Sequence, residues 1–325
     1  MTQATEISVA PDVLDRGRGC LVGLGVGDAL GVTLQFTTSA EMARMGALHT
    51  EIVGGGPFRL PAGEVSEPGG MAMALAQSLV ELGRLNTADV ALRYLAWFDE
   101  RPQGADTTVS EAMREVRRGA LPPETSELVH ARFRDVSVSA GALMRCAPLA
   151  LLYQRNMDAL ETASKAEARI THWDEVAGLA SAFENAAIAH LVAGDTLEEA
   201  FASAATRVRG MEGRMDAFVG EIADGRRPRT APDDDLMAVL HAAVWSVLTT
   251  ENFEEALVTA VNLGGYTNTT GAVAGAIAGA HYGEHAMPQR WLSGLRLLDR
   301  LEDLAERLLK IEPVEPLSMV GRISG

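Results

Sequence analysis

Polar side chains gather in a segment that runs from Asn262 to Thr270. It contains two asparagines, a tyrosine and three threonines beside the glycine pair Gly264-Gly265. Residues 272–283, AVAGAIAGAHYG, follow it and are so small that this helix must lie in a crowded interior. Buried polar groups need hydrogen-bond partners. We therefore predict that this segment borders a ligand pocket, with a structural hydrogen-bond network as the alternative.

A second polar segment, residues 61–71, opens a long helix with the sequence PAGEVSEPGGM. A helix start that carries a serine, an acid and glycines can hold an anion or a cation, depending on which groups face inward. Ser66 and Glu67 are therefore candidate site residues. Capping of the helix would explain both of them equally well.

A third segment, residues 19–31, reads GCLVGLGVGDALG. Glycine is unfavourable in a helix by about 1 kcal/mol, so repeated glycine on one face indicates that another backbone packs very close. The segment is not a dinucleotide-binding fingerprint, because no strand precedes it. We expect Asp28 to be a buried anchor or cap rather than a catalyst.

The elements that must position these segments are helices. Alternating β-branched runs are nearly absent, so the sequence predicts an all-α fold, with a single domain over residues 1–325 and a flexible tail over residues 1–12. The polar insert 225–235 is expected to be a solvated surface loop. Apolar residues recur at helical spacing in residues 71–82, 90–98, 142–153, 175–192, 236–248 and 295–309.

Composition excludes several classes of protein. The net charge of −16 argues against binding to nucleic acid, which needs clustered Lys and Arg. Cys20 and Cys146 are too few for a thiolate metal cluster or a disulfide framework. The N-terminus does not read as a secretory signal, and apolar runs are interrupted by Gly or polar residues. We expect a cytoplasmic protein that does not span a membrane.

The three segments together resemble the ADP-ribosylglycohydrolase family, over nearly the whole chain. Residues 19–31 are similar to its opening G-x-x-x-G-x-x-x-GDA-x-G. Residues 139–149, SAGALMRCAPL, are similar to its NG-x-x-MR-x-x-P-L helix, with Ala140 in place of Asn. Thr171-His172 is similar to its TH pair, and VNLGG at 261–265 followed by Thr269 to its most diagnostic stretch.

This resemblance implies an orthogonal helical bundle with a central cleft, where family members hold two Mg²⁺ or Mn²⁺ ions and cleave the bond at the anomeric carbon of ADP-ribose. The family's ligands come from a T-D-D and a D-x-D-T motif, since hard divalent ions need charged oxygen ligands. Aligned on the flanking residues, these positions fall here on Ser66, Glu67, Pro68, Tyr266 and Asn268. The family's acid in the loop after GDA-x-G falls on Gln35.

The two motifs contain four aspartates, and only one of these four positions, Glu67, carries a carboxylate in this chain. Repulsion between two dications would then be poorly compensated, so we expect no dimetal centre and no required Mg or Mn cofactor. A single weak ion on Ser66, Glu67, Asn268 and Thr269 is an alternative. Glu67 and His172 are the candidate catalytic residues, although a structural role for His172 is an equal alternative. The candidate ligand-binding residues are Gln35, Ser66, Gly264, Gly265, Tyr266, Asn268 and Thr269.

Three functions follow from this comparison. The leading hypothesis is a protein that binds ADP-ribose, a related nucleotide or an ADP-ribosylated partner with little or no metal-dependent hydrolysis. The second is an active hydrolase of an ADP-ribosyl or other glycosidic bond with a remodelled, metal-poor site. The third is a scaffold protein whose cleft is closed by Pro68 and Tyr266.

Overall fold

Two glycine-rich helices pack against each other at the centre of the molecule. The computed structural model describes residues 7–100, 104–133, 138–233 and 235–316, and in it α1 (Pro11–Gly31) and α14 (Thr267–Tyr282) run antiparallel. A Cβ at Gly27 would overlap the carbonyl oxygen of Gly271, and a Cβ at Gly23 would overlap that of Gly275. The close backbone approach predicted from the repeated glycines is therefore confirmed, because any larger residue would force these helices apart.

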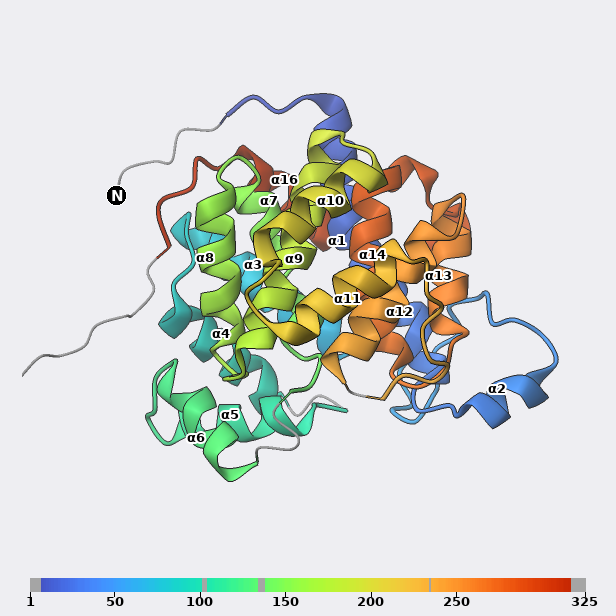
Figure 1. The fold of residues 1–325 in the computed structure, drawn as a ribbon, viewed down its shortest axis with the longest axis horizontal. Helices are drawn as coiled ribbons and strands as arrows, with labels where there is room; N and C mark the ends of the chain where they lie inside the picture. The colour runs from blue at the N-terminus through green and yellow to red at the C-terminus, as the bar shows by residue number, and fades with distance from the viewer. Residues whose placement is uncertain (1–6, 101–103, 134–137, 234, 317–325) are drawn as a thin grey trace, which may run out of the picture.

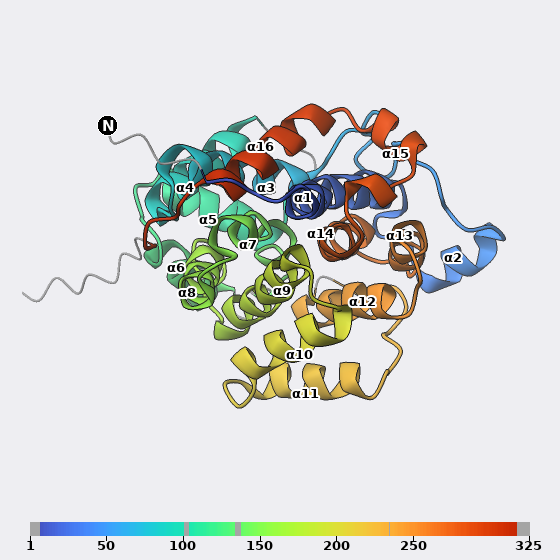
Figure 2. The ribbon, with the colours of Figure 1, turned by 90° about the horizontal axis from the view of Figure 1, so that it is seen from above.

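The remaining helices surround this central pair in layers. Figure 2 shows α16 on one side of α1, with α9 and α12 on the other side and α10 and α11 as an outer layer beyond them. The short helix α2 stands away from the body at the lower right of Figure 1. Besides α1 and α14, the α-helices are α2 (Ser39–Met45), α3 (Glu67–Leu82), α4 (Thr87–Asp99), α5 (Thr107–Arg117), α6 (Glu124–Arg132), α7 (Pro148–Tyr153), α8 (Met157–Ala168), α9 (Glu175–Ala193), α10 (Leu197–Val208), α11 (Gly213–Ala223), α12 (Leu236–Leu248), α13 (Phe253–Val261), α15 (Gln289–Gly294) and α16 (Leu298–Lys310).

The all-α prediction is confirmed, and the helices predicted from apolar spacing are present. The described residues contain isolated β-bridges but no strand. The stretch predicted as one helix over 142–153 is divided into the 3₁₀ turn η2 (Leu143–Arg145) and α7. Pro148 explains the division, because proline has no N–H to donate and is favoured in the first turn of a new helix. The side-chain oxygens of Asn86 and Asn252 cap α4 and α13.

Two expectations concern the chain as a whole: a flexible N-terminal tail and the lack of a membrane span. Within the expected flexible tail over residues 1–12, residues 7 and 11–12 belong to the fold, since α1 begins at Pro11 and the Ile7 N–H donates to the Lys310 carbonyl at 3.0 Å. Residues 1–6 lie outside the described residues. The helix α9 is long and apolar enough to cross a membrane, yet 89% of its most apolar window is buried inside the fold. Such burial is typical of a core helix in a globular domain.

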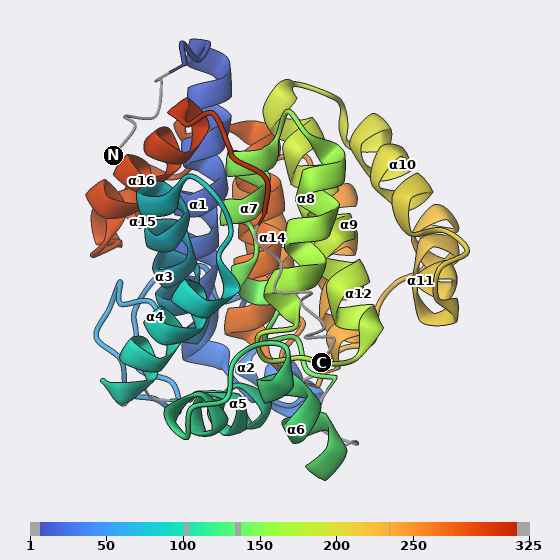
Figure 3. The ribbon, with the colours of Figure 1, turned by 90° about the vertical axis from the view of Figure 1, so that its left-hand side faces the viewer.

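Three helix ends converge at one end of the central pair. The C-terminal end of α1 and the N-terminal ends of α3 and α14 meet there, joined by hydrogen bonds from Ser66 to Asp28 and from Thr267 to the Gly31 carbonyl. In Figure 3, α5 and α6 lie across this lower end of the molecule. The polar segments that the sequence singled out are thus brought to one place.

Candidate functional site

Asp28 anchors the start of α3 to the end of α1. Its carboxylate accepts hydrogen bonds from the Ser66 N–H at 2.8 Å, the Gly69 N–H at 2.9 Å and the Ser66 hydroxyl. Burial raises the pKa of Asp28 to about 6, while these hydrogen bonds act in the opposite direction. The side chain is fully buried, so Asp28 has the anchoring role that the sequence indicated.

Glu67 follows directly and occupies the first position of α3. A carboxylate at this position is stabilised by the N-terminal end of the helix dipole. Its Oε2 accepts a hydrogen bond from the Asp106 N–H at 2.9 Å, which joins α3 to the start of α5. Glu67 is 5% exposed and lines the cavity described below.

Neutral side chains from three segments meet at the start of α14 and form hydrogen bonds with one another. The Asn268 amide Nδ2 donates to Ser66 Oγ at 2.9 Å, and its Oδ1 accepts from the Thr269 N–H at 2.8 Å. The Asn268 N–H donates to Gln35 Oε1 at 3.2 Å. We call Gln35, Ser66, Asn268 and Thr269 the neutral cluster. The sequence singled out all four residues, and the structure brings them into contact.

Gly264 and Gly265 support the site through backbone packing. Both have positive φ angles, 81° and 75°, which disfavour any residue with a side chain. The Gly265 carbonyl accepts from the Phe36 N–H at 2.7 Å, and a Cβ on Gly265 would overlap the carbonyl oxygen of Pro232. Neither glycine is among the residues that line the cavity. Asn262 also faces away from it, because its amide bonds the backbone of His49.

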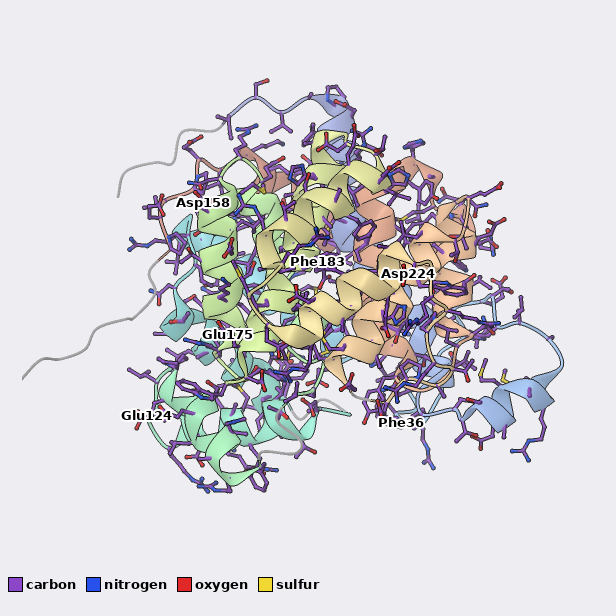
Figure 4. All side chains as sticks on the ribbon, in the orientation of Figure 1. Phe36, Glu124, Asp158, Glu175, Phe183 and Asp224 are labelled. Atoms are coloured by element: carbon purple, nitrogen blue, oxygen red, sulfur yellow. The ribbon has the colours of Figure 1, made fainter. Side chains whose placement is uncertain are left out.

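A cavity of about 630 Å³ opens beside the neutral cluster. Phe36, Phe58 and Tyr266 form one side, with ring centroids 5.8 Å apart for Phe36 and Phe58 and 5.1 Å for Phe36 and Tyr266. Phe36 is 47% exposed and has a φ of 67°, and it lies at the lower edge of the molecule in Figure 4. The other lining residues are Gln35, Glu67, Gly104, Ala105, Asp106, Thr107, Val138, Ser139, Gly141, Met144, Asp233, Asp235, Asn268 and Thr269.

Carboxylates form another part of the lining. Glu67 was expected, but Asp106, Asp233 and Asp235 also line the cavity. Asp106 caps α5 by accepting from the Thr108 N–H, and Asp235 caps α12. An aspartate before a helix is a signal for capping, so sequence patterns alone gave no reason to assign these two residues to a site. No Lys or Arg is among the described residues that line this cavity.

A chain of buried hydrogen bonds leads from Asp106 into the core. The Ser139 hydroxyl lies 2.6 Å from Asp106 Oδ2 and 2.7 Å from His172 Nε2. On the far side of the ring, His172 Nδ1 lies 2.7 Å from the Thr171 hydroxyl, which accepts from Arg145 Nη2 at 2.8 Å. Since an ionised Asp106 only accepts, Ser139 donates to it and accepts from a protonated His172 Nε2. Thr171 then donates to the unprotonated Nδ1.

His172 is therefore held as a neutral imidazole in one tautomer. Burial lowers its pKa to about 3, and the nearby Arg145 charge acts in the same direction. The ring is fully buried and is not among the residues that line the cavity. The structure thus places His172 one side chain away from the cavity, with both nitrogens engaged, rather than on the cavity wall.

A buried ion pair ends this chain. Arg145 Nε donates to Glu167 Oε1 at 2.7 Å, and the Tyr94 hydroxyl donates to the same oxygen at 2.7 Å. The Arg145 guanidinium lies 4.6 Å from the centroid of the Tyr94 ring. Arg145 and Glu167 are both fully buried, so each depends on the other to compensate for lost hydration. The ion pair fixes the far end of the hydrogen-bonded chain.

Within the described ranges, no three His, Cys, Asp or Glu side chains come close enough together to hold a metal ion. The four residues considered for a single ion do lie near one another, but three of them belong to the neutral cluster and Glu67 bonds the start of α5.

Comparison with known proteins identifies relatives over most of the chain. Residues 10–316 match the family model described as ADP-ribosylglycohydrolase. The ADP-ribosyl-[dinitrogen reductase] glycohydrolase of Rhodospirillum rubrum is 32% identical over 88% of this chain and 92% of its own length. The ADP-ribosylarginine hydrolase Tri1 of Serratia proteamaculans is 29% identical over 93% and 81%, respectively.

A solved structure shows the same similarity in three dimensions. It is described as an ADP-ribosylglycohydrolase-related protein complex and superposes with a TM-score of 0.77 at 31% sequence identity. The matched region covers 92% of this chain and 99% of that chain. The likeness therefore extends over nearly the whole of both chains.

Proposed function

The chain belongs to the ADP-ribosylglycohydrolase family, and we propose that it binds an ADP-ribose unit, free or attached to a protein side chain, without a dimetal centre. The observation that carries this proposal is the combination of an open cavity with neutral amide side chains, Gln35 and Asn268, at two positions where the family has acids. Two relatives have names that specify ADP-ribosylarginine hydrolases, so the preferred attachment is an arginine side chain.

The donor set of the neutral cluster does not fit two divalent ions. Ser66 Oγ is engaged with Asp28 and Asn268, and Asn268 Oδ1 accepts from Thr269. Gln35 Oε1 is engaged with the Asn268 N–H. Mg²⁺ and Mn²⁺ favour ionised carboxylates over amides and hydroxyls that are already hydrogen-bonded. The binding and the chemistry proposed here therefore do not depend on a metal ion.

The cavity suits the sugar end of the proposed ligand. Its volume of about 630 Å³ lies within the range of about 300–1,000 Å³ that is usual for small-molecule sites. Phe36, Phe58 and Tyr266 offer ring faces and edges to a planar group. Glu67 and Asp106 offer oxygens to ribose hydroxyls and a negative field to a guanidinium.

The open cavity also argues against a scaffold with a closed cleft. Tyr266 forms a wall of the cavity instead of filling it, because its ring rests edge-on against Phe36. Pro68 is buried in the first turn of α3 and is not among the lining residues. Neither of the two residues that the sequence suggested would close the cleft fills the cavity.

Calorimetric titration with ADP-ribose tests the proposal. We expect saturable binding with the same affinity in EDTA and in Mg²⁺, and weaker binding by Phe36→Ala because one ring wall is lost. Leu48→Ala is the matched control, since Leu48 is 69% exposed and does not line the cavity. Absence of binding in both buffers would overturn the proposal, and binding only with Mg²⁺ would overturn its metal-independent form.

A second candidate function is metal-independent hydrolysis, and the position of Asp106 favours it. Ser139 holds this carboxylate on the cavity wall, where it can take a proton from a water molecule that attacks the ribose anomeric carbon. The carbon–nitrogen bond to the guanidine breaks, and the leaving nitrogen takes up the proton that Asp106 received from the water molecule, which regenerates the carboxylate. His172 would act here as a positioning residue through Ser139, and not as the base.

Release of ADP-ribose from ADP-ribosylated arginine distinguishes binding from hydrolysis. In EDTA, hydrolysis should persist in the wild type and in Asp233→Asn, an exposed carboxylate at the cavity, and disappear in Asp106→Asn. No release by the wild type would reject the second candidate and leave the binding proposal in place. Release that Asp106→Asn leaves unchanged would reject the role of Asp106.

A further inference from the structure

A second cavity, with a volume of about 340 Å³, is rich in arginine and shares Asp235 with the main one. It is formed by α11, by the loop that begins at Asp224, labelled in Figure 4, and by the start of α12. We call it the arginine cavity. In a chain of net charge −16, a local concentration of cations needs a specific explanation. Its basic lining residues are Arg214, Arg226, Arg227, Arg229 and His241.

Two of these guanidinium groups are neutralised within the protein. Arg214 forms ion pairs with Asp174 at 2.7 Å and with Glu212 at 2.8 Å. Arg226 pairs with Glu221 at 2.9 Å. These ion pairs hold Arg214 and Arg226 in place, and they neutralise most of the positive charge that the two residues could offer to a ligand.

The other two guanidinium groups belong to exposed arginines of the loop, Arg227 and Arg229. Arg227 lies over the ring of Trp245 at 5.7 Å from its centroid, and both Arg227 and Arg229 are exposed. Across the part of the chain that the structure describes, no acidic side chain lies within 4.0 Å of either group. This cation–π contact with Trp245 helps to hold the Arg227 guanidinium at the cavity.

The loop that carries these arginines forms backbone hydrogen bonds with the segment that includes Tyr266, a residue of the main cavity. The Ala231 N–H donates to the Leu263 carbonyl at 2.7 Å, and the Pro232 carbonyl accepts from the Tyr266 N–H at 3.1 Å. Asp235, at the end of the same loop, lines both cavities. A ligand in the main cavity and an anion in the arginine cavity would therefore be neighbours.

We propose that the arginine cavity binds a diphosphate group. Arg227 and Arg229 supply the cationic groups that are absent from the described residues lining the main cavity. Arginine forks bind phosphate oxygens in pairs. The diphosphate belongs either to the ligand of the main cavity or to a separate nucleotide, and the first source rests on the function proposed above.

Titration with inorganic pyrophosphate at about 150 mM salt tests the site, since this ionic strength screens non-specific attraction. The test variant is Arg227→Gln/Arg229→Gln. The control is Arg155→Gln/Arg209→Gln, which removes two exposed arginines outside the cavity and changes the net charge equally. We expect pyrophosphate binding to weaken by about tenfold or more in the test variant and to stay unchanged in the control. No saturable binding, or equal loss in both variants, would overturn the proposal.

Titration with ADP-ribose then separates the two sources. Competition with pyrophosphate assigns the diphosphate to the ligand of the main cavity, and additive binding assigns it to a separate nucleotide; both results support the site. If pyrophosphate binds through Arg227 and Arg229 but ADP-ribose does not bind, the function proposed above fails and the anion site stands. If ADP-ribose binds and the test variant retains full pyrophosphate affinity, the anion site fails and that function stands.

Discussion

Ser139 donates a hydrogen bond to Asp106 across 2.6 Å, although 33 positions separate the two residues in the chain. Because the hydroxyl has one proton, this bond determines that His172 must donate to Ser139 from Nε2. The orientation of a cavity carboxylate is thus linked to the tautomer of a buried imidazole. The same reasoning extends through Thr171 to Arg145, so a guanidinium in the core influences a carboxylate at the cavity.

Removal of the Ser139 hydroxyl should destabilise the fold. Ser139→Ala leaves the buried His172 N–H without its acceptor, which costs about 1–3 kcal/mol of unfolding free energy. Urea unfolding measures this change. Ser203→Ala on the outer helix α10 is a control, because its side chain lies outside this hydrogen-bonded chain, and it should be nearly neutral. Equal stability of Ser139→Ala and wild type would contradict the hydrogen bonding described here.

His172 should make stability depend on pH. Its folded-state pKa of about 3 lies below the ordinary value of 6.5, so the unfolded chain binds a proton that the folded protein rejects between these two values. Stability therefore falls as the pH drops from 6.5 towards 3, by at most about 1.4 kcal/mol per pH unit. Replacement by His172→Gln, which can still donate and accept, should remove this loss.

Asp28 contributes with the opposite sign. Its folded-state pKa of about 6 lies above the ordinary value of 3.8, so its contribution is present at low pH and is lost as the pH rises through 6. The two groups partly cancel in the wild type, and a comparison of variants is needed. Between pH 7 and pH 5, the wild type should lose about 2 kcal/mol relative to His172→Gln in urea unfolding. Parallel pH profiles for the two proteins would refute the neutral, buried state of His172.

New carboxylates at the family's ligand positions should create metal binding. Tyr266→Asp/Asn268→Asp places two acids beside Glu67 and replaces an amide that is engaged with Ser66. Like charges should lower the melting temperature of this variant in EDTA, and saturating Mn²⁺ should raise it by about 5 °C or more.

The wild type and Tyr266→Ala/Asn268→Ala serve as controls for that variant. The alanine pair loses the same contacts but adds no charge, so Mn²⁺ should leave its melting temperature unchanged. The wild type should also show the same melting temperature in Mn²⁺ and in EDTA, because its neutral cluster is hydrogen-bonded internally. A rise in the melting temperature of the wild type with Mn²⁺ would contradict our interpretation of these side chains.

Much of the fold and part of the site could be predicted from the sequence. The apolar spacing of the helices and the repeated glycines of residues 19–31 are local patterns, and each has a direct structural cause. Ser66 and Asn268 could be singled out because each lies at the start of a buried helix, where a polar side chain needs a hydrogen-bond partner. Their mutual contact at 2.9 Å follows from the convergence of α3 and α14.

The carboxylates of the cavity could not be predicted in the same way. Asp106 and Asp235 each stand before a helix, where a capping role explains the residue completely. Their second role depends on the meeting of residues 138–139 with the start of α12, recorded by the bridge between Ser139 and Asp235. Such a contact between distant segments has no local sequence pattern. The contact of Arg227 with the Trp245 ring, which supports its assignment to the arginine cavity, likewise joins residues that no local sequence pattern connects.

Substitution of two helical glycines should separate close packing from helix propensity. Gly27→Ala places a methyl group against the carbonyl of Gly271, so α1 and α14 must separate, and we expect a loss of about 3 kcal/mol or more, or failure to fold. Gly220→Ala in α11 is the matched control, because a Cβ there meets no atom within 4 Å. Alanine is the better helix former, so this variant should gain about 0.5–1 kcal/mol in urea unfolding. A tolerated alanine at position 27 would contradict the close packing of the two central helices.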